Sequence, residues 1–156
     1  MPAVIDFIGR YDHTLDAKNR LMVPQAFRDI VRRADRTARF YLTRGFDQCL
    51  ALYAKSTWTE MVGLLKSRKA DELAHTKTRK FFRLFYSSAV EVTPDKAGRI
   101  LIPEHLKRLA GLKKKVVLIG VNDRIELWDA GRWARFSEGM EGEYEQAASE
   151  AFRSTS

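Results

Sequence analysis

The strongest constraint on the fold is a nine-residue pattern that the chain contains twice. Asp16–Pro24 has the sequence Asp-Ala-Lys-Asn-Arg-Leu-Met-Val-Pro, and Asp95–Pro103 repeats its pattern 79 positions later. Each copy consists of an aspartate, a short turn, an arginine, three apolar residues and a proline. Each follows a strand-like run and precedes a short helix-like run. Because order and spacing recur together, the sequence predicts two copies of one small unit.

The match between the two units continues beyond this pattern. Leu50–Tyr53 aligns with Ile125–Trp128, and Trp58 aligns with Trp133, both at an offset of 75 positions. Each unit has only about 60 residues, a size at which a single hydrophobic core is marginal. We therefore expect the units to share a core, with each other or with a neighbouring chain.

Hydrophobic periodicity predicts the elements of the first unit. Alternation over Phe7–Leu15 indicates a strand, and Arg20–Val23 a short second strand. Pro24 then begins a helix whose buried stripe includes Phe27 and Val31.

Helices are predicted between and after the two units. One opens at Trp58, and a second runs from about Asp71 to Ser88 with basic side chains on its surface. We expect this basic face to be solvated or in a subunit contact rather than on DNA. From Ser137 onward the chain is acidic and is expected to be a frayed helix or disordered.

These patterns divide the chain into four segments. The first repeat covers residues 7–58, connecting helices cover 59–88, the second repeat covers 89–136, and an acidic C-terminal tail covers 137–156.

Charge is distributed unevenly along the chain. The net charge is +8, but residues 138–156 contain five acids and one base, so residues 1–137 carry +12. A basic body with an acidic tail favours a polyanionic partner, most often nucleic acid.

Other features argue against several classes of site. The single cysteine, Cys49, lies in a predicted strand as a small core residue and excludes an intrachain disulfide. His13, His75 and His105 are far apart and lack partners at ligand spacing, so we expect no metal and no cofactor.

We also expect no membrane span, since no apolar run approaches about 20 residues. The first twelve residues lack a signal pattern, and with the cysteine content this favours the cytoplasm.

A wider set of residues matches one known family. It consists of Gly9, Leu15–Arg20, Val23-Pro24, Phe27-Arg28, Cys49–Tyr53, Trp58, Asp95–Pro103, Ala110–Leu112 and Glu126–Trp128. Over about Phe7 to Phe136 the chain resembles MraZ, the bacterial regulator of the division and cell-wall gene cluster. The resemblance implies an α+β, β-rich fold of two tandem AbrB-type swapped-hairpin repeats, forming one compact pseudo-symmetric domain with peripheral helices.

The resemblance also implies a function and partners. It implies a transcriptional regulator, not an enzyme, that binds double-stranded DNA at direct repeats in its own promoter. It further implies a ring-shaped, octamer-like homo-oligomer that is cytoplasmic and associated with the nucleoid, with no small-molecule substrate.

In the family the first D-x-K-G-R loop faces DNA, which assigns Lys18 and Arg20 to DNA binding. Asn19 replaces the family's glycine, and we expect the turn to survive because asparagine tolerates the same backbone. In the second copy the lysine has moved to Lys96, so Lys96 and Arg99 are expected to be weaker contacts.

The chemistry of these side chains fits the assignment but leaves an alternative. Arg20 can bond guanine O6 and N7 with two parallel hydrogen bonds, and Lys18 suits a phosphate as a point charge. The alternative is that Arg20 and Arg99 pair with Asp16 and Asp95 and only hold the turns closed.

Two alternatives at the level of function follow from the same residues. Asp16 and Asp95, in equivalent turns, resemble an acid–base pair, but neighbouring lysines would keep both ionised, so we expect no catalytic residues. The other alternative is an oligomeric scaffold or RNA-binding protein that contacts polyanions without sequence selection.

Overall fold

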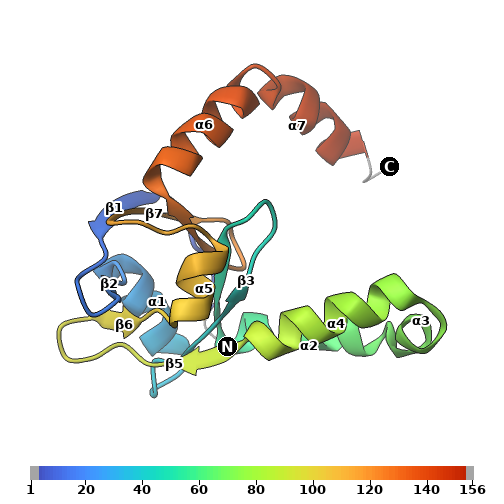
Figure 1. The fold of residues 1–156 in the computed structure, drawn as a ribbon, viewed down its shortest axis with the longest axis horizontal. Coiled ribbons are helices and arrows are strands. Elements are labelled where there is room, and N and C mark those ends of the chain that lie inside the picture. Colours follow the sequence, from blue (N-terminus) through green and yellow to red (C-terminus); the bar gives the residue numbers. More distant parts are fainter. Residues whose placement is uncertain (1–3, 154–156) are drawn as a thin grey trace.

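A computed structural model describes residues 4–153 of the chain (Figure 1). Within these residues eight strands and seven helices form an α+β fold, as predicted. The strands are β1 (Arg10–Thr14), β2 (Arg20–Met22), β3 (Phe40–Arg44), β4 (Leu50–Ala54), β5 (Val90–Val92), β6 (Arg99–Leu101), β7 (Lys115–Gly120) and β8 (Ile125–Asp129). The helices are α1 (Gln25–Ala34), α2 (Lys55–Lys66), α3 (Lys69–Ala74), α4 (Thr76–Ser88), α5 (Glu104–Leu109), α6 (Ala130–Glu141) and α7 (Tyr144–Arg153).

The two repeats exchange strands in the larger sheet. Its six strands run in the order β1-β7-β8-β4-β3-β5. The first strand of each repeat pairs antiparallel with the third strand of the other, so β1 lies beside β7 and β5 beside β3. The fourth strands, β4 and β8, pair at the centre. This order reads the same from either repeat and confirms the predicted swapped-hairpin fold.

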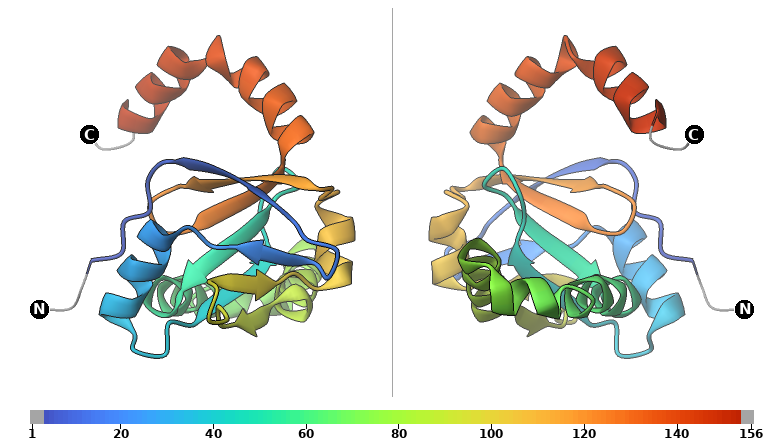
Figure 2. Two further views of the ribbon diagram at one scale, coloured as in Figure 1. Left: turned by 90° about the vertical axis from the view of Figure 1, so that its left-hand side faces the viewer. Right: turned by 90° about the vertical axis from the view of Figure 1, so that its right-hand side faces the viewer.

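The second strands, β2 and β6, form a separate two-stranded ribbon. They pair antiparallel with Leu21 opposite Ile100. These two side chains are 0% and 1% exposed, so one face of the ribbon belongs to the core. α1 and α5 flank the ribbon on its two sides, as the left view of Figure 2 shows. Each begins directly after a proline, Pro24 or Pro103, as the sequence predicted for the first helix of each repeat.

One hydrophobic core joins the two repeats. Its buried side chains come from the large sheet, from the ribbon and from α1 and α5. Phe27 of α1 and Leu106 of α5 occupy equivalent places and are almost wholly buried. Because the strands are exchanged, neither repeat can bury its half of this core alone. The expectation of a shared core is therefore confirmed, and the partner is the other repeat.

Aromatic side chains attach the outer helices to the other face of the sheet. Trp58 of α2 is stacked between Tyr41 and Phe85, with ring centroids 5.2 and 5.6 Å away. In the second repeat Trp128 packs edge-to-face against Trp133 of α6 at 5.3 Å. Cys49 is fully buried in the same small cluster as Trp128, which confirms its predicted role as a core residue.

Two boundaries differ from the predicted ones for identifiable backbone reasons. The strand predicted over Phe7–Leu15 begins only at Arg10, because Gly9 has a φ of 95° that interrupts the extended backbone. The helix predicted from about Asp71 is divided at His75, whose φ of −123° and ψ of 127° are those of extended backbone.

The acidic C-terminal segment is helical. α6 continues through Glu141, and α7 covers Tyr144–Arg153. Alanine, glutamate and glutamine, which have high helix propensity, make up much of α7. Of the two alternatives expected for this segment, a frayed helix or disorder, a helix is observed, and the expectation of disorder is wrong for these residues.

Leu21→Ala and Ile100→Ala, at equivalent sites, are each expected to lower the free energy of unfolding by about 2–5 kcal/mol. Each removes a fully buried side chain from the core that both repeats share. Urea denaturation followed by circular dichroism should show one transition for each variant. Leu64→Ala, at a site that is 67% exposed on α2, is the control and should change stability by no more than about 0.5 kcal/mol. Two separate transitions would contradict the shared core.

Candidate nucleic-acid interface

The Asp16 side chain closes the first turn, residues 16–20. Its Oδ1 accepts hydrogen bonds from the backbone N–H groups of Lys18 at 2.9 Å and Arg20 at 2.8 Å. Its Oδ2 accepts a bond from Arg20 Nε at 2.8 Å. Asn19 has a φ of 61°, in the left-handed region that asparagine tolerates. The turn therefore survives the replacement of the family's glycine, as predicted.

Asp95 closes the second turn, residues 95–99, with the same set of bonds. Its Oδ1 accepts from the backbone N–H groups of Ala97 and Arg99, both at 2.9 Å. Its Oδ2 accepts from Arg99 Nε at 3.2 Å. Gly98, with a φ of 86°, takes the place of Asn19. The two turns thus share one geometry although their three middle residues differ.

These bonds lower the pKa of both aspartates. The backbone N–H of Arg20 is the main cause that lowers the pKa of Asp16, and the backbone N–H of Arg99 does the same for Asp95. A carboxyl pair that shares a proton needs one raised pKa. Both pKa values are lowered, so the geometry gives no support to the acid–base alternative.

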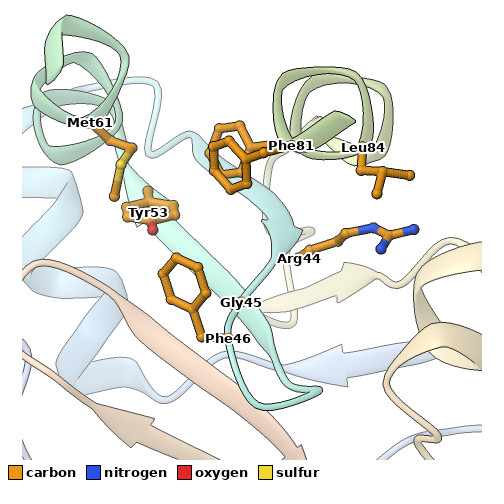
Figure 3. Close-up of a pocket in the computed structure, with 8 residues that line it drawn as sticks. Arg44, Gly45, Phe46, Tyr53, Met61, Phe81 and Leu84 are labelled. Carbon is orange, nitrogen blue, oxygen red and sulfur yellow. The ribbon is translucent and has the colours of Figure 1, made fainter. Parts of the chain in front are cut away.

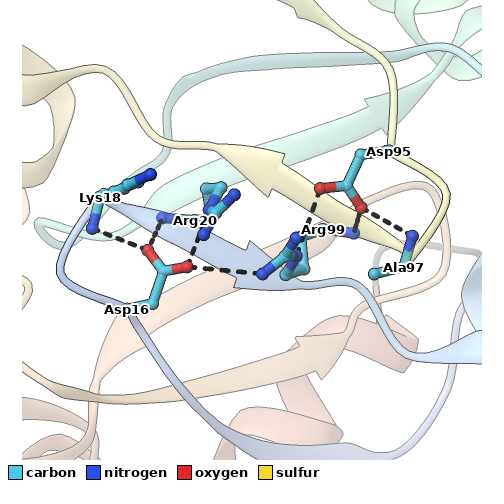
Figure 4. A network of polar contacts seen from close by, with 6 residues as sticks. All are labelled: Asp16, Lys18, Arg20, Asp95, Ala97 and Arg99. Carbon is cyan, nitrogen blue, oxygen red and sulfur yellow. Dashed lines mark hydrogen bonds and ion pairs between the residues drawn. The ribbon is translucent and has the colours of Figure 1, made fainter.

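The two arginines lie on one face of the β2–β6 ribbon. Arg20 is opposite Leu101, and Met22 is opposite Arg99. Side chains alternate along a strand, so these four point away from the core face that holds Leu21. Figure 4 shows the two turns at opposite ends of the ribbon with the arginines between them.

Asp16 connects the two turns electrostatically. Arg99 Nη1 lies 3.7 Å from Asp16 Oδ2, the same oxygen that Arg20 Nε contacts at 2.8 Å. One carboxylate therefore contacts both arginines, although they belong to different repeats. The Arg20 side chain remains 34% exposed and that of Arg99 33% exposed.

The structure brings all four predicted DNA-binding residues to this ribbon. Arg20 and Arg99 lie on its outer face, and Lys18 and Lys96 are exposed in the turns at its two ends. The alternative that each arginine pairs with its own aspartate is also realised. The two roles are compatible, because Nε–H is only one of five guanidinium donors, and the remaining four lie on Nη1 and Nη2.

Side chains of the second repeat brace the first turn. Asn19 Nδ2 donates to Glu104 Oε2 at 2.9 Å, and Lys107 Nζ donates to Asn19 Oδ1 at 2.9 Å. The backbone N–H of Ile102 also donates to the Asn19 carbonyl at 2.8 Å. Asn19 thus replaces glycine and gains side-chain bonds to α5 that glycine cannot make.

The first repeat braces the second turn in a matching way. The backbone N–H of Val23 donates to the Gly98 carbonyl at 2.9 Å. Arg28 donates from Nε to the Val23 carbonyl at 2.8 Å. Its guanidinium lies so close to Gly98 that a Cβ there would be 2.5 Å from Arg28 Cζ. The φ of Gly98 therefore favours glycine or asparagine, and any side chain there would displace the Arg28 guanidinium.

Sequence reasoning did not assign Arg28 and Lys107 to this site. They are equivalent residues of α1 and α5, 79 positions apart. The repeat register was the available signal, since both are basic and both follow the repeated proline by four positions. Each contacts the turn of the other repeat and adds a cation beside it.

A second surface feature is an apolar pocket of about 200 Å³ beside α4. It is lined by Arg44, Gly45, Phe46, Tyr53, Met61, Phe81, Leu84 and Phe85 (Figure 3). Phe46 and Leu84 are 65% and 48% exposed. The basic side chains Lys80 and Arg83 of α4 are exposed nearby in the sequence, so the region combines apolar surface with positive charge.

α6 and α7 form an arm that leaves the body on the side away from α2–α4 (Figure 1). Tyr144, at the start of α7, is 73% exposed, and Ala147 one turn later is also exposed. Glu143, Glu145 and Glu150 make the arm acidic. The arm is therefore amphipathic and opposite in charge to α4.

Among residues 4–153, no three His, Cys, Asp or Glu side chains are grouped so that they could hold a metal ion. No helix in this range has the length and apolarity that crossing a bilayer requires.

A protein-family model described as "MraZ protein, putative antitoxin-like" matches the chain twice, over residues 7–82 and 85–154. The tandem match covers almost the whole chain and falls once on each repeat. It agrees with the internal repeat of the sequence and with the pseudo-symmetry of the sheet.

The variant Asp16→Asn/Asp95→Asn is expected to be less stable than the wild type at pH 7, with a gap that closes in acid. Both carboxyls have a pKa below their usual value of 3.8 in the folded protein. Their contribution to stability is therefore present above that value and is lost as pH falls through the lowered pKa. Urea midpoints measured from pH 7 to about pH 2.5 test this. Asp29→Asn/Glu60→Gln removes two carboxylates elsewhere and is the control; a gap that stays constant with pH would contradict the role of the turns.

Proposed function

This chain belongs to the MraZ family, and on that premise we propose that it is a sequence-specific DNA-binding transcriptional regulator. We propose that it acts at the nucleoid on the division and cell-wall gene cluster, and that it binds direct repeats in its own promoter. The observation that carries the proposal is the outer face of the β2–β6 ribbon. There, two arginines from different repeats are held side by side by aspartates, with an exposed lysine at each end.

The dimensions and chemistry of this face suit the major groove. The groove is about 12 Å wide and admits a two-stranded ribbon. Arg20 Nε is held by Asp16 at 2.8 Å, so the planar guanidinium is fixed before it meets DNA. Its Nη1 and Nη2 groups form the fork that bonds guanine O6 and N7. An arginine that is already positioned loses less conformational entropy on binding.

Lys18 and Lys96 have a different role from the two arginines. Lys18 and Lys96, at the ends of the ribbon, are placed to contact phosphates on either side of the groove. Phosphate contacts fix register and orientation, whereas base contacts specify sequence. The charge of +12 over residues 1–137 favours this approach to a polyanion.

We propose a second copy of the chain as the protein partner, in a ring-shaped homo-oligomer. The acidic arm α6–α7 complements the basic, apolar region around Leu84 and Arg83 in charge and in apolar surface. Within one chain the arm and this region lie on different sides of the body (Figure 1). A contact between two different surfaces is heterologous and closes into a ring or extends into a filament. A ring would present several ribbons to repeated DNA sites and raise their combined affinity.

Arg20→Ala is expected to reduce discrimination between the upstream DNA of its own gene and a scrambled duplex by about 1–3 kcal/mol. The variant removes the base-reading fork but leaves most of the positive charge. Fluorescence anisotropy titrations at several salt concentrations measure both affinities. Arg33→Ala, which removes an exposed cation from the outer face of α1, is the matched control and should keep the discrimination.

Two outcomes would contradict this function. Equal affinity of the wild type for both duplexes, with the same salt dependence, would favour a non-specific polyanion-binding scaffold, since specific sites are usually bound about 10³-fold or more tightly. Unfolding of Arg20→Ala would show that the arginine only holds its turn closed.

Leu84→Glu and Tyr144→Lys are each expected to give monomers in size-exclusion chromatography with light scattering. The first introduces an acid into the pocket, and the second removes an apolar side chain from the arm and adds a positive charge between Glu143 and Glu145. Mixed in equal amounts, the two should form dimers, because each mixed pair has one intact pocket and one intact arm. Leu73→Glu, at a site 81% exposed outside the pocket, is the control and should keep the wild-type mass. A mixture that stays monomeric would contradict the heterologous contact.

A further inference from the structure

The outer face of the ribbon carries two apolar side chains that the pairing of arginine with aspartate does not explain. Leu101 is 59% exposed, whereas Ile100 and Ile102 on either side of it are each 1% exposed. Met22 lies on the same face and is half-buried. Leu101 therefore contributes little to the core, although it lies in a strand between two buried residues.

The register of the ribbon places each apolar side chain directly across from an arginine. Leu101 is the partner of Arg20, and Met22 is the partner of Arg99. Side chains directly opposite in an antiparallel pair have Cβ atoms about 4.5–5.5 Å apart. The face thus presents two couples, each made of one arginine and one apolar side chain, with the two arginines on a diagonal.

The two repeats contribute equally to each couple. Arg20 comes from the first repeat and its partner Leu101 from the second, and the reverse holds for Met22 and Arg99. Neither repeat alone can form a couple. The pairing is therefore a product of the folded ribbon, and each repeat alone contains only half of it.

In the major groove, an apolar side chain has one specific target. Base edges there present hydrogen-bond donors and acceptors, and the single apolar group is the 5-methyl group of thymine. When an arginine bonds guanine O6 and N7, the Cβ atom of its cross-strand neighbour lies about 4.5–5.5 Å from the arginine Cβ. This is somewhat more than the rise of about 3.4 Å between base pairs, so the adjacent base pair is within reach of that side chain. A leucine in that position can pack on a methyl group but can make no hydrogen bond to any base.

We propose that Leu101, and with it Met22, determines sequence specificity by packing on the thymine methyl group next to the guanine that the opposite arginine reads. This inference rests on the proposed function, because it names what the same ribbon face recognises. Leu101 is the stronger contact of the two, since it is the more exposed. The predicted recognition element is a thymine adjacent to a guanine, once for each couple.

Replacing thymine by deoxyuridine tests the proposal directly, because it deletes only the methyl group and keeps base pairing. Each thymine of the bound upstream duplex is replaced in turn, and affinities are measured by anisotropy. The wild type is expected to bind about three- to five-fold more weakly when the contacted methyl is removed, the value for burying one methylene-sized group. Thymines elsewhere in the duplex should be insensitive.

Leu101→Ala is the informative variant. It should bind thymine DNA about as weakly as the wild type binds uracil DNA. Its affinity should no longer change when deoxyuridine replaces the thymine that Leu101 contacts. Leu64→Ala, which truncates a leucine of similar exposure on α2, is the matched control and should keep the wild-type response. Because Leu101 is exposed, its truncation should leave the thermal midpoint and the oligomer mass unchanged.

The outcomes separate this proposal from the function on which it rests. If the wild type prefers its upstream DNA but is indifferent to uracil at every thymine, the methyl contact is wrong and the DNA-binding function stands. A Leu101→Ala protein that keeps the full uracil penalty would also overturn the contact. If the wild type binds upstream and scrambled DNA equally, the function itself fails, and the inference fails with it.

Discussion

The hydrogen bonds between β1 and β7, and their counterparts between β5 and β3, make one fold out of two units. Each strand pair joins residues that lie far apart in the sequence and belong to different repeats. Without the exchange, every repeat would have an unpaired sheet edge and half of a core. With it, β4 and β8 meet at the centre, and Phe27 and Leu106 are buried in one cluster.

The same exchange builds the candidate interface. Once the large sheet is assembled, β2 and β6 have no partner except each other, and their pairing brings Arg20 and Arg99 onto one face. The helices that follow each strand then contact the turn of the opposite repeat, Lys107 through Asn19 and Arg28 beside Gly98. The position of every cation on this face therefore depends on contacts between the repeats.

Local features of the sequence predicted most elements, because they depend on neighbours along the chain. The alternation around Tyr11, the proline at Pro24 and the left-handed backbone of Asn19 are of this kind. The sequence alone did not reveal which strand pairs with which, and it did not reveal contacts such as the one between Asn19 and Lys107, since these depend on the assembled fold. The resemblance to a known family predicted the exchange of strands between the repeats, which hydrophobic periodicity alone cannot predict. The interruption at Gly9 was missed because a single positive φ leaves the hydrophobic alternation unchanged.

Joining the two turns in one chain has a consequence for how the ribbon meets a ligand. In a symmetric dimer of identical chains, each side chain would occur twice, and the face would look the same from both ends. Here the ends differ: one has Lys18 and Asn19, and the other has Ala97 and Gly98. The contact between Arg99 and Asp16 adds to this difference. The two ends of the ribbon are therefore distinguishable, and the ribbon has a direction. A directional surface suits DNA sites that all point the same way along a duplex better than sites arranged as palindromes.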